Sequence, residues 1–311
     1  MGLVDTYRGI KESIVAFVPR VFPSIDDKGG PPPFPPIIGT GFVVRDDGLI
    51  ATNNHVVASF KGLTRLPGAS EDDWPVVAML LKRTDMGIIE VPLTVCATAV
   101  VSGFKPGKVY YGPPKPDIAF VRVSVRGLAH VTVDGETVLE EGMEVATAGF
   151  PMGRDALMAP GRMHQITPTL QRGIISAVMP FAGSHPHAIA VNVMAHGGAS
   201  GSPVFLPDTG NVVGILYGGL VDVKVTESGE EIRIPTNISH AVPGHMVALA
   251  LNTFAKMENT ELPSNTPTLD ELISSATLVN RFDDETTYVP MPIDGAIDIT
   301  GIQLTVRRDE E

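Results

Sequence analysis

Short runs of apolar and β-branched residues, separated by turn residues, follow one another along most of the chain. They lie at 39–45, 49–52, 76–82, 86–95, 118–125, 144–150, 173–178, 188–193, 204–205 and 212–217. Asp46, Asp47 and Gly48 supply turn chemistry between the first two runs, which predicts a β-hairpin there. Because no long helices alternate with these strands, a parallel α/β sheet is disfavoured, and an all-β barrel or sandwich is predicted.

Helical spacing is confined to the two ends of the chain. Between residues 5 and 18 apolar side chains recur at intervals of three and four, which predicts an amphipathic helix ended by Pro19. Its apolar stripe can pack on its own chain or on another copy, so a homo-oligomer formed through this helix is left open. After Pro243 an apolar series predicts a second helix, and Thr268 with Glu271 forms a capping-box signature before a third.

These elements divide the chain into three predicted parts. Residues 1–38 hold the first helix and a Pro-rich linker. Residues 39–247 hold most of the strands, and residues 248–311 form a helical extension with a final strand at 296–306. With 43% hydrophobic and 19% charged residues, the chain has the profile of a globular protein that buries a core.

Composition argues against several classes of function. A formal net charge of -12 and a sequence pI near 5.1 oppose binding to nucleic acid or to an anionic membrane surface. No run approaches the ~20 apolar residues of a membrane span. A single cysteine, Cys96, cannot form an intramolecular disulfide, and no N-terminal leader is visible. A cytoplasmic location is therefore expected.

A serine between glycines is the first candidate for chemistry. A tight turn at this point can expose the hydroxyl of Ser200 while the amides of Gly198 and Ser200 point into one small space. His55 follows one predicted strand, and Asp117 precedes another. Asp117 would then accept a hydrogen bond from one imidazole nitrogen of His55 and leave the other to take the Ser200 proton.

The candidates belong to short motifs that occur in a specific order. The motifs are Gly39-Thr40-Gly41-Phe42, Thr52-Asn53-Asn54-His55-Val56, Asp117-Ile118-Ala119 and Gly198-Ala199-Ser200-Gly201-Ser202-Pro203. In these segments the chain resembles the trypsin-like serine peptidases, and more specifically their bacterial Deg/HtrA and glutamyl-endopeptidase-like branch. The resemblance implies two six-stranded antiparallel β-barrels with the triad His55, Asp117 and Ser200 in the cleft between them. It further implies an acyl-enzyme mechanism that needs no cofactor and no metal.

Three departures from the family pattern limit what the resemblance implies. Ala199 stands where zymogen-activated members carry an aspartate, so activation by N-terminal cleavage is not expected. The C-terminal part is too short and too helical for the PDZ domain of many bacterial relatives. His185, His187 and His196 lack an accompanying Cys or carboxylate motif, so no metal site is predicted.

The walls of a specificity pocket are expected from two stretches, one just before the serine and one on a later strand. They are Met194, Ala195 and His196, and Tyr217, Gly218 and Gly219. Because neither stretch contains an acidic residue, cleavage after Lys or Arg is disfavoured, and a small or medium apolar residue before the scissile bond is favoured. His196 could instead favour an acidic residue there.

Two hypotheses for the function follow from these residues. The first is a serine endopeptidase that acts on a peptide or protein substrate. The alternative is a protease-like peptide-binding or scaffold module without turnover.

Overall fold

The computed structural model describes a large part of the chain, in several ranges. These are residues 2–23, 36–70, 73–84, 87–102, 115–151, 158–159, 163–164, 167–181, 185–226, 229, 231–257, 262–275, 278–280, 292–293, 296–298 and 304–307. The predicted Pro-rich linker falls almost wholly outside them. No helix among these ranges is long and apolar enough to cross a bilayer.

The first barrel contains six antiparallel strands in the order β6-β5-β1-β3-β4-β7, and pairing of β6 with β7 closes it. The strands are β1 (Ile14–Pro19), β3 (Gly39–Arg45), β4 (Leu49–Thr52), β5 (Val76–Thr84), β6 (Gly87–Val100) and β7 (Ala119–Val123). The predicted hairpin between 39–45 and 49–52 is confirmed as β3 and β4, which pair through Phe42 and Ala51.

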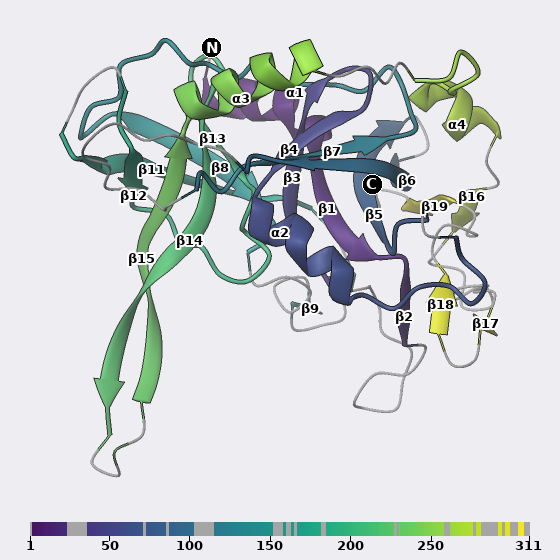
Figure 1. Ribbon diagram of the computed structural model, residues 1–311, viewed down its shortest axis with the longest axis horizontal. Coiled ribbons are helices and arrows are strands. Elements are labelled where there is room, and N and C mark those ends of the chain that lie inside the picture. The colour runs from purple at the N-terminus through teal and green to yellow at the C-terminus, as the bar shows by residue number, and fades with distance from the viewer. Residues whose placement is uncertain are drawn as a thin grey trace.

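The second barrel closes through the order β11-β12-β15-β14-β13-β8, again with antiparallel neighbours. Its strands are β8 (Glu144–Gly149), β11 (Thr169–Met179), β12 (Ala188–Val191), β13 (Pro203–Phe205), β14 (Val212–Val225) and β15 (Glu231–Pro243). Figure 1 shows the two barrels next to each other, with the far ends of β14 and β15 projecting away from both as a long hairpin. The expected fold class, all-β with two six-stranded barrels, is confirmed.

The N-terminal helix is shorter than the sequence predicts. Helix α1 (Leu3–Ile10) gives way to a 3-10 turn, η1 (Lys11–Ser13), and residues 14–18 lie in β1 between β3 and β5. Every residue of β1 is buried. The helix prediction is wrong beyond Ile10 because a run buried on both sides carries no alternation that would distinguish strand from helix. The division of the chain at residues 38 and 248 stays a prediction, and β1 places part of the first segment inside the barrel.

Three apolar clusters account for the packing. One fills the first barrel and includes Phe17 and Phe60, whose rings lie 5.4 Å apart. A second fills the other barrel. The third contains Phe42 and Phe120 from the first barrel together with Phe205 and other residues from the second, so it joins the two barrels. Burial of this shared cluster fixes the barrels relative to each other, because apolar area removed from water stabilises their contact.

Helices cover the ends of this shared cluster. Helix α3 (Gly244–Met257) follows β15 as predicted, and its Phe254 packs on Phe120. Helix α1 packs on its own chain: Leu3, Tyr7 and Ile10 lie on the shared cluster, and the Tyr7 hydroxyl donates a hydrogen bond to the carbonyl of Pro168 at 2.7 Å. Assembly of copies through α1 stays a prediction.

The predicted capping box is confirmed at α4 (Leu269–Ser275). The amide of Thr268 donates to the Glu271 carboxylate at 2.8 Å, and the amide of Glu271 donates to the Thr268 hydroxyl at 3.2 Å. These hydrogen bonds lower the pKa of Glu271.

The remaining strands are short. They are β2 (Val21–Pro23), β9 (Met158–Ala159), β10 (Met163–His164), β16 (Leu278–Asn280), β17 (Pro292–Ile293), β18 (Ala296–Asp298) and β19 (Leu304–Arg307). The single final strand predicted at 296–306 is wrong: this segment contributes β18, which pairs with β2, and β19, which pairs with β6. Its two halves therefore extend different sheets.

Candidate active site

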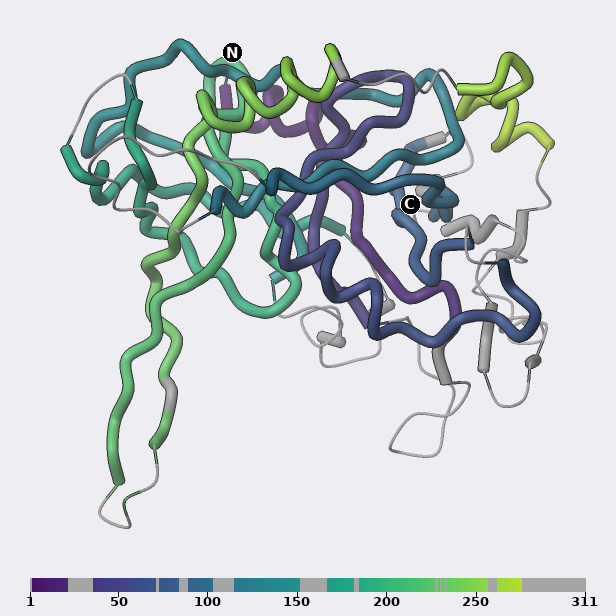
Figure 2. Tube along the Cα trace, viewed as in Figure 1, coloured from purple at the N-terminus to yellow at the C-terminus, as the bar shows by residue number. Residues whose placement is uncertain are grey.

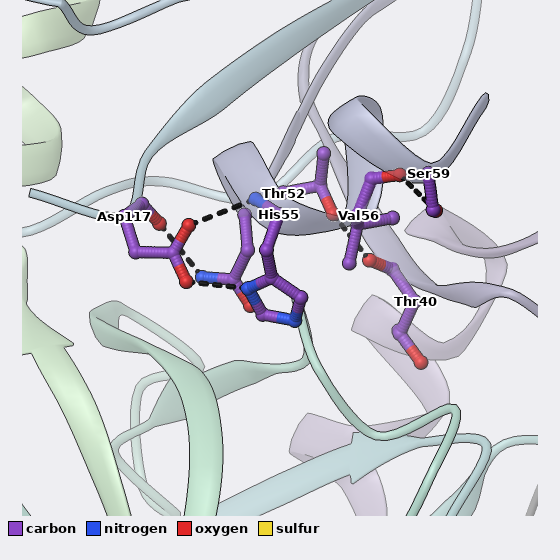
Figure 3. Close-up of polar contacts among 7 residues, drawn as sticks. Thr40, Thr52, His55, Val56, Ser59 and Asp117 are labelled. Atoms are coloured by element: carbon purple, nitrogen blue, oxygen red, sulfur yellow. Dashed lines mark hydrogen bonds and ion pairs between the residues drawn. The ribbon is translucent and has the colours of Figure 1, made fainter. Parts of the chain in front are cut away.

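His55 and Asp117 are brought together by the first barrel. His55 lies in the first turn of α2 (Asn54–Ser59), directly after β4, and Asp117 lies two residues before β7. The imidazole Nδ1 is 2.5 Å from the Asp117 Oδ2, and the backbone amide of His55 donates to Oδ1 at 3.0 Å. Figure 3 shows both contacts, with the second ring nitrogen turned away from the carboxylate.

This contact determines where the imidazole carries its proton. An ionised carboxylate only accepts hydrogen bonds, so Nδ1 is the protonated nitrogen of neutral His55 and Nε2 is left as an acceptor. The imidazole is half-exposed at 48%, whereas the Asp117 side chain is 18% exposed. The imidazole is therefore accessible, whereas the carboxylate bonded to it is largely covered.

Asn53 is a positioning residue that the sequence analysis did not identify. Its side-chain Nδ2 donates to the backbone carbonyl of Asp117 at 2.8 Å, and the residue is fully buried. It thus ties the segment before β7 to the segment before α2. A polar residue at the end of an apolar strand was the available signal.

The serine loop, residues 196–202, belongs to the second barrel but is held by Thr40 of β3. The amide of Thr40 donates to the carbonyl of Ser200 at 2.8 Å, and its hydroxyl donates to the carbonyl of Gly198 at 2.7 Å. The Thr40 carbonyl accepts from the Thr52 hydroxyl at 2.7 Å. Thr40 is completely buried, so water cannot bond to its polar groups, and these hydrogen bonds satisfy them instead.

Glycines allow the serine loop to approach the first barrel this closely. A Cβ on Gly201, whose φ is +89°, would lie 1.9 Å from the Thr40 carbonyl oxygen. A Cβ on Gly39 would lie 2.7 Å from the Val56 methyl carbons and 3.3 Å from the Ser200 carbonyl oxygen. Gly39 therefore lies between the residue after His55 and the backbone of Ser200, which places the serine loop beside the start of α2.

The two candidate oxyanion donors differ in how they are held. The carbonyl of Ala199 accepts from both the amide and the hydroxyl of Ser202, at 3.0 and 2.6 Å, which fixes the peptide unit that carries the Ser200 amide. The Gly198 amide belongs to the peptide unit between Gly197 and Gly198, two units earlier, and Gly198 has a φ of +94°. The orientation of the Ser200 amide is thus set by two hydrogen bonds within the serine loop.

The stretches predicted to form a specificity pocket lie against each other. A Cβ on Gly219 would meet the Ala195 carbonyl oxygen at 2.7 Å. The backbone of Met194 is held by Gln171, which donates to its carbonyl at 2.9 Å and accepts from its amide at 3.0 Å. His196 lies at the start of the serine loop, where its carbonyl accepts from the Ala199 amide at 3.0 Å.

His240 on β15 is a neighbour of this region that the sequence analysis did not identify. Its ring stacks on Tyr217 with centroids 5.9 Å apart, and it pairs across the strands with Gly218. Burial lowers the pKa of His240, so its ring is neutral at neutral pH. No signal short of the strand register would have located it, because β15 was not predicted.

Other histidines gather at the start of α3. His185 and His245 lie with ring centroids 5.2 Å apart in an edge-to-face arrangement, and His187 is near enough to influence His245. In the part of the chain that the structure describes, no group of three or more His, Cys, Asp or Glu side chains is arranged to hold a metal ion. Burial, followed by the charges of His185 and His187, lowers the pKa of His245 to about 4.

We expect His245 to make the free energy of unfolding decrease as the pH is lowered. Its pKa is about 4 in the folded protein and 6.5 in the unfolded chain, so between these values the unfolded state binds more protons. The free energy of unfolding should therefore drop by about 1 kcal/mol between pH 7 and pH 5, after allowance for solvent screening of a half-buried ring. Urea unfolding at both pH values should show that His245→Asn removes this drop and that His130→Asn, at an exposed histidine, does not. An unchanged pH dependence in His245→Asn would contradict the assignment.

The first barrel carries a histidine–carboxylate pair, and the second carries a serine loop that is hydrogen-bonded to the first barrel. Two closed antiparallel barrels arranged in this way define the class of double-barrel peptidase folds. The model of the trypsin-like peptidase domain matches residues 39–215, which is more than half of the chain. The chain therefore belongs to the trypsin-like peptidase family.

Curated relatives connect the chain to the DegP-like group. A probable periplasmic serine endoprotease DegP-like of Halomonas elongata is 29% identical over 178 residues, covering 57% of this chain and 28% of the relative. Its counterpart in Ectopseudomonas mendocina is 27% identical over 217 residues, which cover 69% of this chain and 35% of that relative. The chain thus spans about a third of the length of these relatives. The resemblance to the Deg/HtrA branch is confirmed.

Solved structures show the same fold. The HtrA-type protease AlgW with a decapeptide superposes with a TM-score of 0.50 at 16% sequence identity, covering 82% of this chain and 68% of that chain. At this identity the likeness concerns the fold alone.

The expected cytoplasmic location is wrong. The curated relatives are named as periplasmic endoproteases. The physical reason for the error is that one cysteine, Cys96, makes no disulfide within the chain in either compartment, so cysteine usage could not distinguish them.

Proposed function

We propose that this protein is a serine endopeptidase in which His55, Asp117 and Ser200 form the catalytic triad. The observation that carries the proposal is the 2.5 Å contact between the His55 Nδ1 and the Asp117 carboxylate, which leaves Nε2 as an available base. Membership in the trypsin-like peptidase family and the curated DegP-like relatives support it. A periplasmic location is part of the proposal, because those relatives are named for it.

The reaction follows from these roles. Nε2 of His55 takes the hydroxyl proton of Ser200 as Oγ bonds to the scissile carbonyl carbon, and the amides of Gly198 and Ser200 receive the oxyanion. His55 then gives the proton to the departing amine nitrogen, the C–N bond breaks, and an acyl-ester remains on Ser200. Water, deprotonated by His55, hydrolyses the ester, and the proton returns to the Ser200 oxygen.

A small or medium apolar residue before the scissile bond is the preferred substrate feature. Residues 194–196 and 217–219 contain no acidic side chain, and the neighbouring His240 is neutral at neutral pH because burial lowers its pKa. The proposed pocket therefore offers no full charge to either a basic or an acidic substrate residue, apart from that of His196 when it is protonated.

A fluorophosphonate probe tests the proposal, since only a serine activated by a base reacts with it. The wild type should be labelled, and labelling should disappear in Ser200→Ala and in His55→Ala. Ser59→Ala is the control, because the Ser59 hydroxyl donates to the Val56 carbonyl of its own helix at 2.6 Å, as drawn in Figure 3. Equal labelling of all variants would reject the assigned serine. An unlabelled wild type that still binds peptides would favour a binding module without turnover.

A further inference from the structure

The hairpin of β14 and β15 extends well beyond the second barrel. Its outer part, which we call the arm, comprises residues 220–225 and 231–236. Its two strands pair with each other from Val221 opposite Pro235 outward. The trace in Figure 2 shows the arm projecting away from both barrels. Among the residues that the structure describes, the arm is thus a sheet of two strands.

The arm is unusually apolar for a segment in this position. Of the thirteen exposed large hydrophobic side chains of the described residues, six lie on it: Leu220, Val221, Val223, Val225, Ile232 and Ile234. The three valines are between 46% and 66% exposed. An isolated two-stranded hairpin is marginally stable in water, and a concentration of exposed apolar side chains is typical of an interaction surface.

The two edges of the arm differ in their capacity to pair with a further strand. The β15 edge carries Pro235, and natural sheets place proline on edges that stay unpaired. Residues 221–225 of β14 contain neither proline nor glycine, and in the described part of the chain they pair with β15 alone. This segment lies outside residues 217–219, which belong to the proposed specificity pocket. The outer edge of β14 is therefore the one suited to pairing.

The sequence of this edge is complementary to itself. It reads Val221-Asp222-Val223-Lys224-Val225, with a charge of each sign placed evenly about the central valine. Identical antiparallel strands related by a two-fold axis keep opposite side chains on one face, so the axis must pass beside one residue. With the axis at Val223, Val221 lies opposite Val225 of the second copy. In the same register Asp222 lies opposite Lys224 of the second copy.

Other two-fold registers of this edge are unfavourable. An axis at Asp222 would set that carboxylate against its own copy, and an axis at Lys224 would do the same with two ammonium groups. Like charges directly opposite each other destabilise a sheet, whereas opposite charges stabilise it. Both charged side chains are exposed in the single chain, so each is accessible to a second copy. The charges therefore select the register centred on Val223.

Pairing in this register would join two arms into a sheet of four strands. One face would bring together the valines of both copies, three from each. On the other face, Asp222 lies opposite Ile234 and Lys224 lies opposite Ile232 within each arm. Each contact between Asp222 and Lys224 of the two copies would thus have isoleucine on both sides. A sheet of more than two strands with an apolar face has the stability in water that a lone hairpin lacks.

We propose that the arm is a self-association element, through which two copies of this chain pair edge to edge and antiparallel along residues 221–225. This inference goes beyond the proposed peptidase function and does not depend on it. It also uses a different element from α1, which packs on its own chain. A two-fold contact of this kind closes on itself, so it doubles whatever unit the barrels form.

Charge reversal on the arm tests the proposal, with the mass of the assembly measured by sedimentation velocity in a Ser200→Ala background that prevents self-cleavage. Asp222→Lys would set lysine against lysine, and Lys224→Asp would set aspartate against aspartate, in both symmetric contacts. Each variant should raise the dissociation constant at least about tenfold and sediment with half the parental mass. Asp208→Lys and Lys61→Asp make the same changes at exposed residues outside the arm and should keep the parental mass.

An equimolar mixture of the Asp222→Lys and Lys224→Asp variants tests the register. Every contact between the two variants joins a lysine of one to an aspartate of the other, so the mixture should regain the parental mass. This recovery would also show that both variants are folded. A parental mass equal to that of both arm variants would overturn the proposal. A mixture that stays at half the parental mass would overturn the register centred on Val223. The result is independent of fluorophosphonate labelling, which decides the peptidase function alone.

Discussion

Asp117→Asn is expected to lower kcat for peptide hydrolysis about ten-thousandfold without unfolding the protein. The two contacts of Asp117 explain why. The backbone amide of His55 is a donor and requires the oxygen of the new amide, so the NH2 group is left facing Nδ1. Nδ1 must then accept a hydrogen bond, the imidazole proton moves to Nε2, and the base that should receive the Ser200 proton is blocked.

The control for this prediction is Asp208→Asn, the same change at an exposed aspartate on a turn. Both variants should keep the wild-type circular dichroism and unfolding midpoint, and only Asp117→Asn should lose turnover. A loss smaller than about tenfold would show that Asp117 does not set the protonation of His55.

Gly201→Ala should abolish detectable activity and lower the free energy of unfolding by about 3 kcal/mol. A methyl group at this position would lie 1.9 Å from the Thr40 carbonyl oxygen and 2.4 Å from the Thr52 hydroxyl oxygen. Relief of that overlap requires the serine loop to move away from β3, which breaks the bonds from Thr40 to Ser200 and Gly198.

Gly142→Ala provides a matched comparison, because Gly142 has the same φ of +89° but nothing within 4 Å of the position of a Cβ. It isolates the cost of the left-handed backbone, about 1 kcal/mol, from the cost of the overlap. Chemical denaturation measures the free energy of unfolding of both variants, and hydrolysis of a short peptide substrate measures their activity. Similar results for the two would mean that the close approach of the barrels at Gly201 has no effect of its own.

The sequence was sufficient for much of the fold and for part of the site. His55 and Asp117 could be paired because each lies at the end of a strand, in motifs whose order the family keeps. The role of Thr40 could not be predicted, since it depends on contacts with Gly198 and Ser200 about 160 residues away in the chain, which only the docking of two barrels creates.

The error in β1 comes from burial on both faces of the strand. In β1, Val15 and Phe17 face the interior of the first barrel while Ile14, Ala16 and Val18 face the shared cluster. A strand buried on both faces is apolar throughout, so its pattern matched a helix as well as a strand. The strand β15 and the outer part of β14 were not predicted, although residues 221–225 and 231–234 alternate between apolar and polar as a strand does.

The place of β1 has a practical consequence for anyone producing this protein. The family match begins at residue 39, yet β1 is one of the six strands of the first barrel and pairs with both β3 and β5. A recombinant fragment that begins at residue 39 would leave β3 and β5 each with an unpaired strand edge. Poor solubility of such a fragment would then reflect the missing strand and would not be a property of the longer chain.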